Sequence, residues 1–123
     1  MAFPGELNIN YYKGDTYEFS VYPKNADGSA MNLTDYLPQF TISLVRGETN
    51  TSNLIEVYSN IPSDNPNHVR CAITPAAGNT LDPTKTYFYD VEIRKAGVNY
   101  PFIYTLLTGS ITITDQVSRP VWR

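Results

Sequence analysis

Apolar and polar residues alternate with a period of two along most of this chain, and turn-forming residues interrupt the alternation at short intervals. Strict alternation predicts strands with one buried and one exposed face, because successive side chains of a strand point to opposite sides. The clearest case is 87–94, where Tyr87, Tyr89, Val91 and Ile93 are the inward positions. We therefore predict an all-β chain without a long helix.

Seven or eight short strands are predicted, over 6–12, 15–22, 39–45, 54–58, 68–74, 87–94 and 100–107, the last continuing beyond Gly109. Single helical turns are expected at 34–35 and within 75–82. An antiparallel sandwich of two sheets, immunoglobulin-like in architecture, buries such strands most economically, and a closed barrel is the alternative. The predicted core comprises Phe19, Val21, Phe40, Ile42, Leu44, Val69, Ile73, Tyr89, Val91, Ile93, Tyr104, Ile111 and Ile113.

The last two strands carry two further predictions. Lys95-Ala96-Gly97 indicates a tight hairpin between them. Beyond Gly109 the apolar positions change phase, so that Ile111 and Ile113 no longer continue the pattern set by Phe102. A phase change beside a glycine predicts a β-bulge that lets one long strand bend.

The length and composition of the chain argue against several classes of function. The length of 123 residues suits one domain, with short extensions at 1–5 and 119–123. A net charge of −3 argues against nucleic acid as a partner, and no apolar run is long enough for a membrane span. The start lacks the basic and apolar regions of a signal peptide. One cysteine and one histidine exclude an internal disulfide framework and a Cys/His zinc site, so we expect no metal and no cofactor.

Candidate catalytic groups are few. His68 and Cys71 are three residues apart in a predicted strand, which puts them on opposite faces. Cys71 is in the inward phase and is interpreted as a small core residue. Asp90 and Glu92 share an outward face, where neighbouring carboxylates are usually plain surface charge. We therefore predict a chain that is not an enzyme.

The ten tyrosines are the unusual feature of the composition. Half of them fall on inward phases, and the others suit protein contacts, because an exposed tyrosine offers area and a hydroxyl at low entropic cost. The ends carry further large groups, and Trp122 either folds back over its own domain or reaches a neighbouring subunit. The predicted partner-binding residues are Phe3, Tyr36, Tyr58, Tyr100, Trp122 and Arg123.

Several segments together resemble a known family. They are Tyr12–Phe19 with its Lys-Gly-Asp-Thr centre, Asp27–Thr34, Gln39–Ile42, Thr86–Ile93 with its Tyr-Asp-Val-Glu-Ile run, and Leu107–Arg119. In this order and spacing they resemble small β-sandwich modules of tailed-bacteriophage virions. The most similar group is the N-terminal domain of phage baseplate upper proteins.

The resemblance implies a non-enzymatic structural protein of the virion, assembled in the host cytoplasm. Its partners would be capsid or tail subunits or further copies of itself. Baseplate upper proteins continue into a second part that carries receptor-binding proteins, whereas this sequence stops at Arg123. We therefore expect an accessory module that decorates the capsid surface. The alternatives are a tail, baseplate or neck adaptor, and a carbohydrate-binding module that helps adsorption to the host through Tyr36, Tyr58 and Tyr100.

Overall fold

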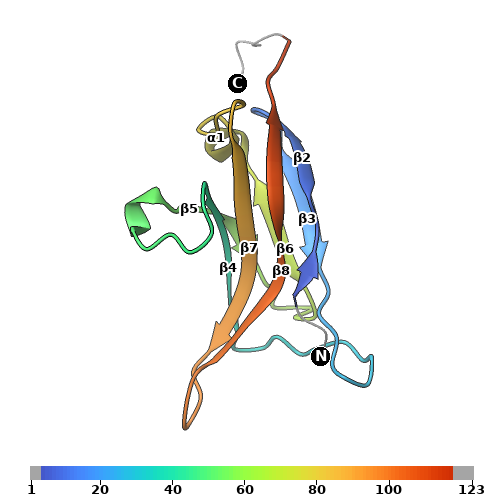
Figure 1. Cartoon of the computed structure of the whole chain (residues 1–123). Coiled ribbons are helices and arrows are strands. Elements are labelled where there is room, and N and C mark those ends of the chain that lie inside the picture. The colour runs from blue at the N-terminus through green and yellow to red at the C-terminus, as the bar shows by residue number, and fades with distance from the viewer. Residues whose placement is uncertain (1–3, 118–123) are drawn as a thin grey trace.

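The computed structural model describes residues 4–117, and in this range the chain is almost entirely strand and loop (Figure 1). The strands are β1 (Gly5–Glu6), β2 (Ile9–Tyr12), β3 (Tyr17–Val21), β4 (Leu37–Ser43), β5 (Ile55–Asn60), β6 (Val69–Ile73), β7 (Thr86–Lys95) and β8 (Phe102–Thr114). Two short helical segments accompany them, the 3-10 turn η1 (Thr51–Asn53) and α1 (Pro75–Gly78). The all-β prediction is confirmed.

The strands form one curled sheet in the order β1-β8-β7-β4-β5-β6-β3, with β2 also on β8. The prediction of a purely antiparallel arrangement is wrong, because β1 and β2 both run parallel to β8. The single strand expected at 6–12 is two short strands that follow the same edge of β8. A parallel pair cannot be closed by a tight turn, and here the rest of the chain supplies the long connection between its members.

The core lies inside the curl of the sheet. Its buried members are Ile9, Tyr11, Met31, Leu33, Phe40, Ile42, Val69, Cys71, Ile73, Leu81, Tyr87, Tyr89, Val91, Ile93, Leu106, Ile111 and Ile113. Of the predicted core, Phe19, Val21 and Tyr104 are only partly buried and pack against it. The prediction for Leu44 is wrong: its side chain is 42% exposed, because β4 ends at Ser43 and the chain leaves the sheet there.

The predicted β-bulge is confirmed, slightly upstream of its expected place. Along the β7–β8 pair the register passes from Val91↔Leu107 to Glu92↔Thr105, which leaves Leu106 as the extra residue. Gly109 has a separate function. A Cβ at this position would lie 1.9 Å from the carbonyl oxygen of Leu7, so the glycine allows the link between β1 and β2 to pass close to β8.

Three predicted local structures have different outcomes. The helical turn within 75–82 is α1, which Pro75 opens and the Thr74 hydroxyl caps by accepting from the N–H of Ala77. The helical turn at 34–35 is wrong: a β-turn occupies this place, with Asp35 at φ 70°. The tight hairpin is also wrong, because Lys95 pairs with Phe102 and the connecting loop spans 96–101.

Candidate interaction surfaces

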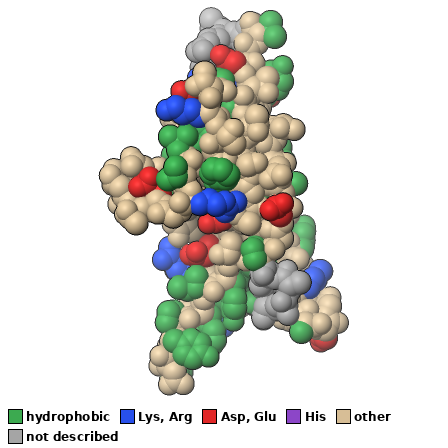
Figure 2. Space-filling model, in the orientation of Figure 1, with side chains coloured by type: hydrophobic (Ala, Val, Ile, Leu, Met, Phe, Trp, Pro, Cys, Tyr) green, Lys and Arg blue, Asp and Glu red, His purple; other side chains and the backbone are tan. Residues whose placement is uncertain are grey.

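The β7–β8 hairpin projects beyond the rest of the sheet, and Figure 2 shows hydrophobic side chains gathered at this end of the molecule. We define the arm as residues 94–104 together with Tyr36 and Leu37 at the start of β4. Val98 is fully exposed, Tyr100 and Leu37 are each 66% exposed, and Ile103 is 53% exposed. The arm is therefore the part of the described chain where large apolar side chains meet solvent together.

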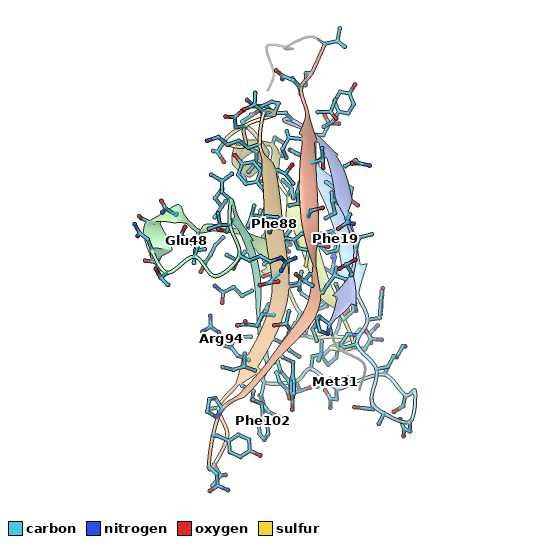
Figure 3. All side chains as sticks on the ribbon, viewed as in Figure 1. Phe19, Met31, Glu48, Phe88, Arg94 and Phe102 are labelled. Atoms are coloured by element: carbon cyan, nitrogen blue, oxygen red, sulfur yellow. The ribbon has the colours of Figure 1, made fainter. Side chains whose placement is uncertain are left out.

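Each face of the arm carries apolar side chains and one cation. On the outer face, Leu37 lies opposite Arg94, and Arg94 lies opposite Ile103. On the inner face, Lys95 lies opposite Phe102, with its ammonium 4.6 Å from the ring centre of Tyr36 and 5.6 Å from that of Phe102. Figure 3 labels Arg94 and Phe102 at the base of the hairpin. The ammonium of Lys95 is therefore in cation–π geometry with two rings of the arm.

Two pairs of aromatic rings lie in the arm. The ring of Tyr100 lies 5.7 Å from that of Phe102 in an edge arrangement, and the ring of Tyr36 lies 6.4 Å from that of Tyr104. Burial, and secondarily Tyr104, raises the pKa of Tyr36. Because 94–104 contains Arg94 and Lys95 but no carboxylate, this part of an acidic chain is locally basic.

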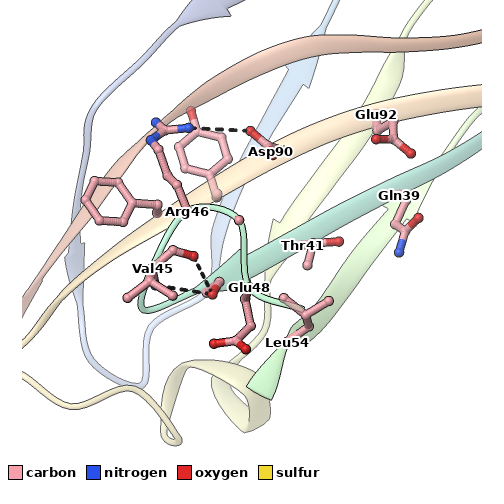
Figure 4. Close-up of a pocket in the computed structure, with 12 residues that line it drawn as sticks. Gln39, Thr41, Val45, Arg46, Glu48, Leu54, Asp90 and Glu92 are labelled. Atoms are coloured by element: carbon pink, nitrogen blue, oxygen red, sulfur yellow. Dashed lines mark hydrogen bonds and ion pairs between the residues drawn. The ribbon is translucent and has the colours of Figure 1, made fainter. Parts of the chain in front are cut away.

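A second surface feature is a groove of about 450 Å³ on the outer face of β4 and β7 (Figure 4). We call it the outer groove. Cross-strand pairs form its floor, namely Gln39 with Glu92, Thr41 with Asp90, and Ser43 with Phe88. The loop that follows β4, which carries Val45, Arg46, Gly47, Glu48 and Leu54, forms its wall. The groove therefore combines apolar side chains with three carboxylates.

Arg46 organises one end of the outer groove. Its guanidinium lies 5.0 Å from the ring centre of Phe88, donates to the Thr108 hydroxyl at 2.9 Å and reaches the Asp90 carboxylate at 4.0 Å (Figure 4). At the other end, Arg94 donates to the Gln39 side chain, whose amide in turn donates to Glu56. Within residues 4–117, no hydrogen bond or ion pair engages the carboxylate of Glu92.

The structure brings together some of the predicted partner-binding residues. Tyr36 and Tyr100 both belong to the arm, where Lys95 and Phe102 connect them. Tyr58 is 51% exposed but lies on β5, opposite Ala72 of β6. The remaining predicted contacts, Phe3, Trp122 and Arg123, lie outside the described residues.

Phe102, Ile103, Val98 and Leu37 were not predicted to be contact residues. The sequence contains an indication of their role, because Tyr100-Pro101-Phe102-Ile103-Tyr104 is apolar at both strand phases. A strand that is apolar on both faces must be covered on both faces or expose one of them. At the hairpin end, no other strand of the described chain covers it.

His68 and Cys71 do not meet. Cys71 is buried in the core, as predicted, and burial raises the pKa of its thiol to about 12. The His68 ring stacks on Tyr22 at 4.8 Å between ring centres, and its Nδ1 lies 2.6 Å from the Asn67 side-chain oxygen. Among the described residues, no group of three or more His, Cys, Asp or Glu side chains is arranged to hold a metal ion.

A scan against protein-family models finds no family that matches this chain, and a search of curated proteins finds no match either. In the described part of the chain, no helix has the length and apolar character needed to cross a membrane.

Proposed function

We propose that this chain is a non-enzymatic structural module of a tailed-bacteriophage virion, bound to other virion proteins through the arm. The observation that carries the proposal is the exposure of Val98, Tyr100, Ile103 and Leu37 on one projecting hairpin. The capsid surface is the preferred location, and a tail, baseplate or neck position is the alternative.

The arm leaves the apolar surface of several large side chains exposed to water. Apolar surface gains roughly 25 cal/mol per Å² when it is covered, so a cluster of exposed aliphatic and aromatic side chains favours a partner. Tyrosine and arginine are enriched at the energetically dominant positions of interfaces, and the arm has Tyr100 and Arg94. A hairpin held by β7–β8 pairing also loses little conformational freedom on binding.

We further infer that the curled sheet is an immunoglobulin-like sandwich. Two features support this: β8 lies between β7 and the first strands, and the Tyr87 hydroxyl accepts from the N–H of Asp82 at 2.8 Å. The second feature resembles the tyrosine corner of such domains, in which a tyrosine hydroxyl bonds the backbone a few residues upstream. The segments that resemble virion modules include the first part of β3, much of β4 and β7, and the second part of β8.

The carbohydrate-binding alternative ranks lower. It requires Tyr36, Tyr58 and Tyr100 to form one exposed platform. Tyr58 is on β5, and the ring of Tyr36 is in contact with Lys95 and near Tyr104. A sugar-stacking platform needs free ring faces, and the three tyrosines do not offer one together.

Particle occupancy tests the proposal. Purified particles of the virus that encodes this sequence should contain the chain, as measured by quantitative mass spectrometry. A V98S/Y100S variant, supplied during assembly in place of the native chain, should occupy the particle much less while its melting temperature stays unchanged. Tyr58→Ser is the matched control, since Tyr58 is similarly exposed outside the arm. Absence of the chain from particles, or equal occupancy by the V98S/Y100S variant, contradicts the proposal.

A further inference from the structure

The arm and the outer groove have complementary chemistry. The arm presents apolar side chains around Lys95 and Arg94, and the outer groove presents Phe88, Leu54 and Val45 beside the carboxylates of Glu48, Asp90 and Glu92. Arg46 engages one of these carboxylates, that of Asp90. In the described chain the ammonium of Lys95 has aromatic rings but no carboxylate within ion-pair distance.

Lys95 and Glu92 cannot form an ion pair with each other within one molecule. They are three residues apart on β7, so their side chains point to opposite faces of the sheet. Glu92 faces the outer groove, and Lys95 faces the inner aromatic cluster of the arm. A cation and a carboxylate that face in opposite directions on one chain can pair only between two chains.

We propose that the arm of one copy docks in the outer groove of a second copy, with Lys95 of the first opposite Glu92 of the second. Val98 and Tyr100 then cover the apolar wall near Leu54. The contact joins two different surfaces, so it is head-to-tail, and its repetition gives a ring or an open chain. The inference rests on the proposed function in one respect only: it uses the same arm.

The volume of the outer groove indicates how strongly two copies should associate. A groove of about 450 Å³ accepts a few side chains, which is less than a standard protein interface. We therefore expect weak self-association of the free protein, detectable between about 10 μM and about 1 mM. Local concentration on an assembly would strengthen the same contact.

Sedimentation velocity over that concentration range tests the proposal with charge-reversal variants. Lys95→Glu and Glu92→Lys should each weaken self-association by more than about tenfold, because each puts like charges together across the contact. The double variant K95E/E92K should recover it, since the pair is restored with its charges exchanged. An equimolar mixture of the two single variants should also associate, because each mixed contact has opposite charges.

Lys85→Glu and Glu18→Lys are the matched controls, since both positions are exposed and lie outside the arm and the outer groove. They should leave self-association unchanged. A wild-type chain that remains monomeric throughout overturns the inference, as does a double variant that stays as weak as the single ones. If the chain is monomeric yet the V98S/Y100S variant loses particle occupancy, this inference fails and the proposed function stands.

Discussion

Tyrosines at the two ends of the molecule have opposite surroundings. At the end that carries α1, Tyr11 and Tyr87 are buried, and their hydroxyls bond the backbone at Asp15 and Asp82. At the arm, Tyr100 is mostly exposed, and no hydrogen bond engages its hydroxyl within residues 4–117. The same residue type therefore closes one end of the core and is exposed to solvent at the other. Burial of the ring and a hydrogen bond of the hydroxyl distinguish Tyr11 and Tyr87 from Tyr100.

The largest difference should appear when the ring is removed. Tyr11→Ala should lower the free energy of unfolding by about 3–5 kcal/mol, because it empties a fully buried site in the core. The neighbouring Tyr12 is 49% exposed, so Tyr12→Ala is the matched control and should cost far less. Urea denaturation measures both variants. A loss at Tyr11 as small as that at Tyr12 would show that the hydroxyl contact with Asp15 and the burial of Tyr11 do not stabilise this end.

A smaller effect should follow from removal of a hydroxyl alone. Tyr87→Phe keeps the ring but leaves the N–H of Asp82 without its acceptor, which should cost about 1–2 kcal/mol. Thermal unfolding followed by circular dichroism measures the loss. Tyr12→Phe, which removes an exposed hydroxyl, should leave the melting temperature unchanged. A Tyr87→Phe variant as stable as the wild type would exclude a stabilising role for the hydrogen bond between Asp82 and Tyr87.

The smallest stability effect is expected at the arm. V98S/Y100S should change the free energy of unfolding by less than about 0.5 kcal/mol, because both side chains are exposed in the isolated chain. Urea denaturation of the same variant used for particle occupancy provides the value. A loss as large as that of Tyr87→Phe would mean that the arm stabilises its own domain, and would remove the contrast between the two ends.

The sequence was sufficient to predict most of the strands, because alternation reports which face of a strand is buried. Tyr89, Val91 and Ile93 are buried as the alternation in 87–94 predicts, and Cys71 lies in the core as its phase predicts. Alternation does not predict the burial of residues that lie outside the strands. Leu33 and Leu81 are fully buried but lie in irregular segments, where only tertiary contacts determine the environment.

The pairing of the strands and the position of the arm were harder to predict from the sequence than the strands themselves. The parallel alignment of β1 and β2 with β8 depends on contacts between the two ends of the sequence, on which local patterns carry no information. The contact residues of the arm were predicted only at Tyr36 and Tyr100, because inward-phase residues such as Tyr104 were assigned to the core. They are left partly outside it because β7 and β8 extend beyond the strands that would cover them.

The parallel pairing of β2 with β8 has a mechanical consequence. The register Ile9↔Ile111 to Tyr12↔Thr114 pairs all of β2 with the last part of β8, and the described chain enters and leaves at opposite ends of the molecule (Figure 1). Tension applied through those ends acts along the strands. The hydrogen bonds of the pair are then loaded together in shear rather than opened one after another, which is the geometry that resists pulling most strongly.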